Sequence, residues 1–197
     1  MKLTTEQSDL LTEIMNVGIG RAAHALSELV QARVVLRIPH VTVGHLSELG
    51  DGAAGNPKGL SLVSQRFDGA SSGAAHLAFE RPSARALVSI LVGSDDEDGI
   101  EAEREAVLLE VGNILINGVM GVLGNVVAED ISFDLPSYSD GAMVTVPAND
   151  TDAVVVNVVL GIEDKCIEGQ LAVAFDARTL DKLWPLLDGE REAGCAR

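Results

Sequence analysis

Apolar residues recur every three or four positions along residues 5–30, which is the spacing of one face of an α-helix. Thr4 precedes this segment and Gln7 follows three residues later, as in a capping box. The apolar face comprises Leu11, Ile14, Met15, Gly18, Ala22, Ala25, Leu26 and Leu29. The pattern therefore predicts a long amphipathic helix over residues 5–30.

Alternating and β-branched segments follow this helix. Residues 32–46 predict a strand that is broken at Pro39, because proline cannot donate to a strand ladder. A hairpin is predicted next, because a short turn separates two strand-like segments at residues 59–67 and 73–79. Pro82 then suits the first turn of a second, shorter helix.

The second half of the chain repeats this order of elements. A long helix is predicted over residues 101–128, with Asp98 as its N-terminal cap. Further predicted elements are strands near 130–135, 142–147, 152–162 and 168–175, and a last helix at about 177–188.

The halves are related by an internal repeat. Glu13 and Asn16 in EIMNVGIGRAAHAL align with Glu110 and Asn113 in EVGNILINGVMGVL, and a second pair of segments aligns further along each half. Because the halves share one hydrophobic pattern, we expect them to share one continuous β-sheet. The predicted fold is α/β (α+β), a single pseudo-two-fold-symmetric domain with two long helices on one face of the sheet.

The predicted boundaries follow from this repeat. The single domain spans residues 1–197, with repeats over about 3–93 and 100–189. The acidic run at 94–99 is expected to be a linker that joins the halves, and 190–197 a C-terminal tail.

Polar residues and glycines lie opposite the apolar stripe of each long helix. On the first helix these are Asp9, Glu13, Asn16, Gly20 and Ser27, and on the second they are Glu110, Asn113, Asn117, Gly121 and Gly124. Asparagine and glycine lower helix propensity relative to alanine, so their presence on two exposed faces favours a functional explanation. The structural alternative is that the polar residues are only solvated and that the glycines permit packing against a neighbouring element.

The spacing of these residues resembles that of the CheC-like chemotaxis phosphatases, which include CheC, CheX and FliY, with CheC the nearest. In that family each long helix carries Asp or Ser, then Glu, then Asn, and a Pro follows further along the chain. The matching residues are Asp9, Glu13, Asn16 and Pro39 in the first copy and Glu110, Asn113 and Pro136 in the second. Ala106 departs from the pattern, as do Met15 and Arg21 in the first copy.

This resemblance implies a hydrolase that removes the aspartyl phosphate of a CheY-type response regulator. The asparagines would orient the attacking water, because an amide offers both a donor and an acceptor. The glutamates would bind a lysine of the regulator, and Asp9, Pro39 and Pro136 would support docking. The regulator would carry the Mg²⁺, so the chain itself is expected to bind no metal or cofactor. The deamidase CheD is a further expected partner, and the alternative function is a non-catalytic binding or adaptor module.

Charge and composition limit the other classes of function. The net charge of -16 disfavours binding to nucleic acid and favours a partner with a basic surface. Neither a signal peptide nor an uninterrupted apolar span is recognised, so we expect a cytoplasmic protein without membrane insertion. Cys166 and Cys195 are expected to be free thiols, and the four histidines lack metal-binding spacing.

Overall fold

The computed structural model describes most of the chain and defines three helices and seven strands in this part. The described residues are 4–45, 59–69, 72–127, 131–142, 152–162, 165–175 and 185. The helices are α1 (Thr5–Val30), α2 (Arg81–Val92) and α3 (Glu97–Val127). The strands are β1 (Val34–His45), β2 (Leu60–Gly69), β3 (Gly73–Glu80), β4 (Ile131–Phe133), β5 (Ser137–Ala142), β6 (Asp152–Ile162) and β7 (Lys165–Phe175).

All seven strands belong to one antiparallel sheet, in the order β1-β6-β7-β3-β2-β4, with β5 also paired to β2. The sheet therefore alternates between the two halves of the sequence: β1 is followed by β6 and β7, then by β3 and β2, and then by β4 and β5. Without β4, the order β1-β6-β7-β3-β2-β5 reads the same from either end when β1, β2 and β3 are exchanged with β5, β6 and β7. The predicted continuous sheet shared by both halves is confirmed.

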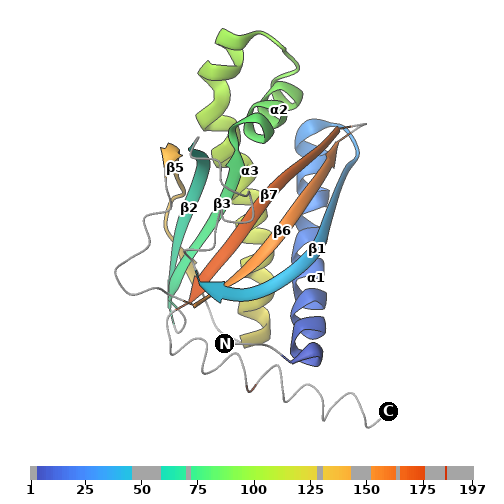
Figure 1. The fold of residues 1–197 in the computed structure, drawn as a ribbon, viewed down its shortest axis with the longest axis vertical. Helices are drawn as coiled ribbons and strands as arrows, with labels where there is room; N and C mark the ends of the chain where they lie inside the picture. Colours follow the sequence, from blue (N-terminus) through green and yellow to red (C-terminus); the bar gives the residue numbers. More distant parts are fainter. Residues whose placement is uncertain are drawn as a thin grey trace.

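Helices α1 and α3 run antiparallel along the same face of this sheet (Figure 1). The main core lies between these helices and the sheet and contains fully buried side chains such as Leu11 and Met15 of α1, Leu115 of α3, and Val156 and Leu171 of the strands. A smaller apolar cluster of mostly alanine and valine lies on the other face. The predicted α+β fold with two long helices on one face is thus confirmed.

Helix α1 begins and ends where simple capping chemistry places it. The Thr4 hydroxyl accepts a hydrogen bond from the Gln7 backbone at 3.2 Å, and the Gln7 side chain accepts one from the Thr4 backbone at 3.0 Å. After the helix, the backbone N–H of Val34 donates to the Ser27 hydroxyl at 3.0 Å. The prediction that Ser27 faces solvent is therefore wrong, since this half-buried residue ties β1 to the end of α1.

Helix α3 begins four residues earlier than predicted. The carboxylate of Asp96 accepts a hydrogen bond from the backbone N–H of Gly99 at 2.9 Å, and Glu97 and Asp98 lie in the first turn. Acidic residues stabilise the N-terminal end of a helix, which explains why the acidic run continues into α3. Residues 97–99 are thus helix and not linker, and Asp98 is not the cap.

Helix α3 is also buried over a broader arc than an amphipathic surface helix. It contacts α1, α2 and the sheet, so Gly124 is buried and the prediction that it lies on the exposed face is wrong. The segment Glu97–Asn125 is the one helix in the described part of the chain that is long and apolar enough to cross a membrane. Half of its most apolar window is buried inside the fold, as is usual for a core helix.

The largest differences between the predicted and the observed strands are at β1 and β5. β1 continues through Pro39 with a shift of register between Arg37 and His40, because a proline on this edge strand cannot donate to β6. β5 begins at Ser137, five residues before the predicted strand, and pairs with β2. The prediction missed these residues because their Ser, Asp and Gly composition is typical of a turn. Residues 143–147 and the last predicted helix at 177–188, apart from Pro185, lie outside the described residues.

A half-buried histidine on β3 is expected to make the stability depend on pH. The Nδ1 atom of His76 lies 2.9 Å from the Ser64 hydroxyl, and burial lowers the pKa of His76 below its ordinary value of 6.5. As the pH falls below 6.5, the unfolded chain therefore binds a proton at His76 more readily than the folded chain does. The contribution of His76 to the free energy of unfolding is thus fully present above pH 6.5 and is lost as the pH falls towards the lower pKa of the folded state. We expect His76→Gln to flatten part of the fall in the free energy of unfolding between about pH 7 and about pH 5.

Urea unfolding of both proteins across this range measures the effect. His24→Gln is the matched control, because the His24 side chain on α1 is 79% exposed and its contact with Glu28 at 3.7 Å is a surface pair that contributes little to stability. Parallel pH curves for the wild type and His76→Gln would contradict the assignment to His76.

Candidate functional site

The exposed faces of α1 and α3 each carry a row of polar and small residues, which we name the first and second ridges. The first ridge consists of Asp9, Glu13, Asn16 and Gly20, all of which are exposed. The second ridge consists of Ala106, Glu110, Asn113 and Asn117, of which Asn113 is half-buried and the others are exposed. The predicted exposure is thus confirmed for Glu13, Asn16 and Glu110, whereas Asn113 is half-buried.

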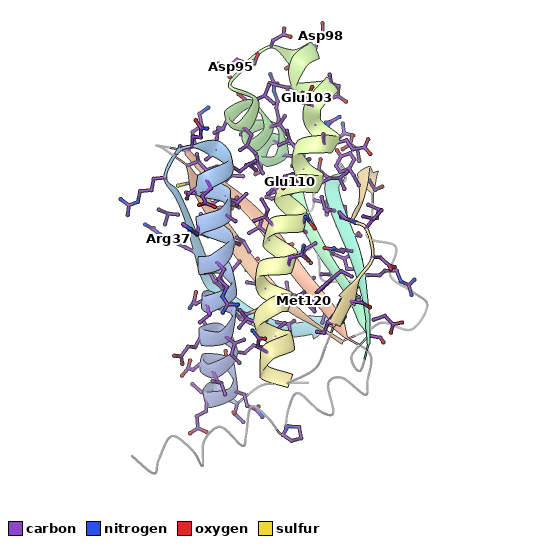
Figure 2. The ribbon with its side chains drawn as sticks, turned by 180° about the vertical axis from the view of Figure 1, so that it is seen from behind. Arg37, Asp95, Asp98, Glu103, Glu110 and Met120 are labelled. Atoms are coloured by element: carbon purple, nitrogen blue, oxygen red, sulfur yellow. The ribbon has the colours of Figure 1, made fainter. Side chains whose placement is uncertain are left out.

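Helical spacing places each glutamate beside its asparagine. Glu13 and Asn16 are three residues apart on α1, as Glu110 and Asn113 are on α3, so each pair shares one patch of helix surface. Figure 2 shows Glu110 on α3 on the side of the sheet that the helices cover, with Glu103 nearer the N-terminal end of the same helix. Each Glu–Asn pair therefore places one carboxylate beside one amide on the surface of its helix.

The ridges are held near each other by a direct contact between the helix backbones. A Cβ atom on Gly18 would lie 2.8 Å from the carbonyl oxygen of Gly118, and one on Gly118 would lie 2.9 Å from the carbonyl oxygen of Gly18. Asn16 precedes Gly18, and Asn113 precedes Gly118, on antiparallel helices. At a rise of about 1.5 Å per residue the asparagines are offset by roughly 10 Å along the helix axes, so the ridges form two separate sites.

Two glycines on the exposed faces have no packing role within the described structure. A Cβ atom built on Gly20, or on Gly121 one turn beyond the second ridge, would meet no atom within 4 Å. The alternative that these two glycines permit packing against a neighbouring element is therefore not supported. Each costs about 1 kcal/mol of helix stability relative to alanine, and each keeps the surface beside an asparagine low.

One hydrogen bond distinguishes the two ridges. The Asn117 amide donates from Nδ2 to Oδ1 of Asn113 at 2.7 Å. The four-residue spacing of these asparagines could have indicated the contact, but the sequence prediction gave Asn117 no role. Gly20 occupies the corresponding place on the first ridge, four residues after Asn16.

The two prolines among the predicted site residues lie at opposite edges of the sheet. Pro39 is on the edge strand β1, and the half-buried Pro136 lies between β4 and β5 at the opposite edge of the sheet. Asp134, beside Pro136, donates its backbone N–H to the carbonyl oxygen of Arg66 at 3.0 Å, which holds this loop on β2. Ala106 leaves the second ridge without the carboxylate that Asp9 supplies on the first.

The two ridges offer carboxylate and amide groups at the surface of the helices. Within these ranges no group of three or more His, Cys, Asp or Glu side chains could hold a metal ion. Cys166 is an exposed free thiol, and Cys195 lies outside the described residues. A carboxylate binds a cationic group of a partner, and an adjacent amide can both donate to and accept from a water molecule.

Comparison with known proteins assigns the family. A family model described as chemotaxis phosphatase CheX matches residues 62–160, which include the whole second ridge. The chain belongs to the CheC/CheX/FliY-like family. The predicted membership is thereby confirmed.

Individual relatives agree with membership of the CheC/CheX/FliY-like family. The CheY-P phosphatase CheC of Bacillus subtilis (strain 168) is 25% identical over 138 residues, which are 68% of this chain and 66% of that protein. The crystal structure of FliY from Thermotoga maritima has a TM-score of 0.76 and 17% identity, over 96% of this chain and 99% of that one. CheX in the CheX-CheY-BeF3-Mg complex from Borrelia burgdorferi has a TM-score of 0.54 and 15% identity, over 83% of this chain and 98% of that one.

Proposed function

We propose that this chain hydrolyses the aspartyl phosphate of a CheY-type response regulator in the cytoplasm. The observation that carries the proposal is a Glu–Asn pair at the surface of each long helix, with Asn113 half-buried and the other three residues exposed, in a member of a chemotaxis phosphatase family. A relative named CheY-P phosphatase CheC and a structure of CheX in complex with CheY support the choice of substrate.

In this mechanism the asparagines act on water. Asn16 or Asn113 holds a water molecule in line with the phosphorus atom of the regulator's aspartyl phosphate, whose Mg²⁺ stays on the regulator. The water oxygen attacks phosphorus, the bond between phosphorus and the aspartyl oxygen breaks, and the aspartate leaves as a carboxylate. The proton of the water passes to the released phosphate or to solvent. Positioning of this kind can contribute several kcal/mol without a nucleophile on the phosphatase.

The glutamates provide the docking contact. Glu13 and Glu110 each accept a charge-assisted hydrogen bond from a lysine of the regulator, which sets the position of the neighbouring asparagine. The net charge of -16 favours approach of a basic surface.

We expect the double variant Glu13→Gln, Glu110→Gln to raise the half-saturating regulator concentration about tenfold, with a much smaller change in the rate at saturation. The matched control is Glu28→Gln, Glu105→Gln, which removes the same charge from exposed positions of α1 and α3 outside the ridges. An equal rise in the control would show that overall charge, and not these two contacts, determines docking.

The proposal is tested by the rate of phosphate loss from a purified CheY-type regulator phosphorylated in the presence of Mg²⁺, with and without stoichiometric protein. Acceleration is expected. Regulator binding without any acceleration would overturn the phosphatase proposal and favour the binding or adaptor module. Binding of CheD stays a prediction from the resemblance, which a pull-down with a cognate CheD would test.

A further inference from the structure

We infer that Asn117 is a positioning residue for Asn113, which makes the second ridge a preorganised site and distinguishes it from the first. The inference rests on the proposed function of Asn113 and deepens it. Its basis is the 2.7 Å hydrogen bond from Nδ2 of Asn117 to Oδ1 of Asn113, within one turn of α3.

In the structure this bond holds the oxygen of the Asn113 amide toward Asn117. An amide side chain can rotate to exchange its oxygen and nitrogen, and while Asn117 presents its Nδ2 donor only the Asn113 oxygen can accept. The Nδ2 donors of Asn113 therefore point away from Asn117 and are available to water or to a phosphoryl oxygen. A hydrogen bond to the carbonyl also polarises the amide and strengthens its N–H groups as donors.

Stability alone does not account for the pair. Asparagine is a poorer helix former than alanine, and a pair of side chains four residues apart on an exposed helix face adds little to stability. Asn113 is nevertheless half-buried, whereas Asn16 on the first ridge is exposed. The second asparagine is thus more confined than the first.

The first ridge lacks this device. Gly20 has no side chain to contact Asn16, and a Cβ atom there would meet nothing within 4 Å. The first ridge instead has the carboxylate of Asp9, where the second has Ala106. We therefore expect the first ridge to dock the regulator more tightly and the second to turn over faster once the regulator is bound.

The first experiment uses Asn16→Ala protein, in which only the second ridge is active. Asn117→Ala and Asn117→Asp, neither of which can donate to Oδ1 of Asn113, should lower the rate at saturating regulator about fivefold, with the half-saturating concentration unchanged. Asn117→Gln keeps a donor within reach and should stay within about twofold of the parent. The positioning role would be overturned by equal rates at saturation for all four proteins. It would also be overturned if only the half-saturating regulator concentration changed.

The second experiment installs the contact on the first ridge. In Asn113→Ala protein, Gly20→Asn should raise the rate at saturation about twofold or more, because it places a donor four residues after Asn16. Gly20→Ala is the matched control, since it removes the same glycine and supplies no donor. Equal rates for these two variants would count against the inference.

A spectroscopic measurement separates this inference from the proposed function. The ¹⁵N order parameter of the Asn113 side-chain amide should fall in Asn117→Ala and recover in Asn117→Gln, whether or not the protein is active. If the protein is an active phosphatase, but neither the order parameter nor the rate changes when Asn117 is substituted, the inference alone is overturned. A protein without activity, but with the expected change in order parameter, would overturn the proposed function and leave the positioning contact standing.

Discussion

The double variant Asn16→Ala, Asn113→Ala is expected to lose phosphatase activity by at least about a hundredfold while it remains folded. In the proposed mechanism each asparagine orients water on its own ridge, so removal of both would leave the docking glutamates without the water-holding asparagine beside each of them. Each single variant keeps one complete ridge and should retain a measurable share of the activity. The measurement is the rate of phosphate loss from the phosphorylated regulator at saturating concentration.

Stability should not account for this loss. Asn16 is exposed and Asn113 half-buried on the helix surface, so alanine creates no core cavity and raises helix propensity at both positions. Asn125→Ala is the matched control, because Asn125 is an exposed asparagine on α3 outside the second ridge. Wild-type activity in the folded double variant would contradict the water-positioning mechanism.

The fold was predictable wherever a single period dominates a segment. The apolar period of residues 5–30 and the capping box at Thr4 defined α1 to the residue. The α3 start was missed because an acidic run reads equally as a solvated linker or as a first helical turn, and the bond from Gly99 to Asp96 decides between them. Gly124 was misplaced because a helical wheel has one buried face, whereas α3 contacts α1, α2 and the sheet.

The exposure of the candidate glutamates was predictable from the sequence, but the contacts around the candidate site were not. The helical period alone placed Glu13 and Glu110 on exposed faces, because both faces oppose a strong apolar stripe. The bond between Asn117 and Asn113 depends on side-chain rotamers that spacing does not fix. Likewise, the wheel placed Gly18 on the buried side of α1 but could not show that its neighbour is the α3 backbone.

The contact between Gly18 and the α3 backbone leads to the second large expected effect, a loss of stability when Gly18 is substituted. Gly18→Ala should destabilise the protein by about 1–3 kcal/mol, because its methyl group would lie 2.8 Å from the Gly118 carbonyl oxygen and from Cα of Val119. Both atoms belong to the α3 backbone, so the clash cannot be relieved by rotation of a flexible side chain. The helices must separate or shift.

Gly20→Ala supplies the matched control two residues further along the same helix. Its methyl group would meet nothing within 4 Å, and alanine is the better helix former, so this variant should gain about 1 kcal/mol. Urea unfolding of the two variants therefore compares one chemical change in two environments, with opposite expected signs. Equal effects would mean that α1 and α3 do not contact each other at Gly18. The axial offset of roughly 10 Å between the two asparagines, which was derived from that contact, would then no longer be supported.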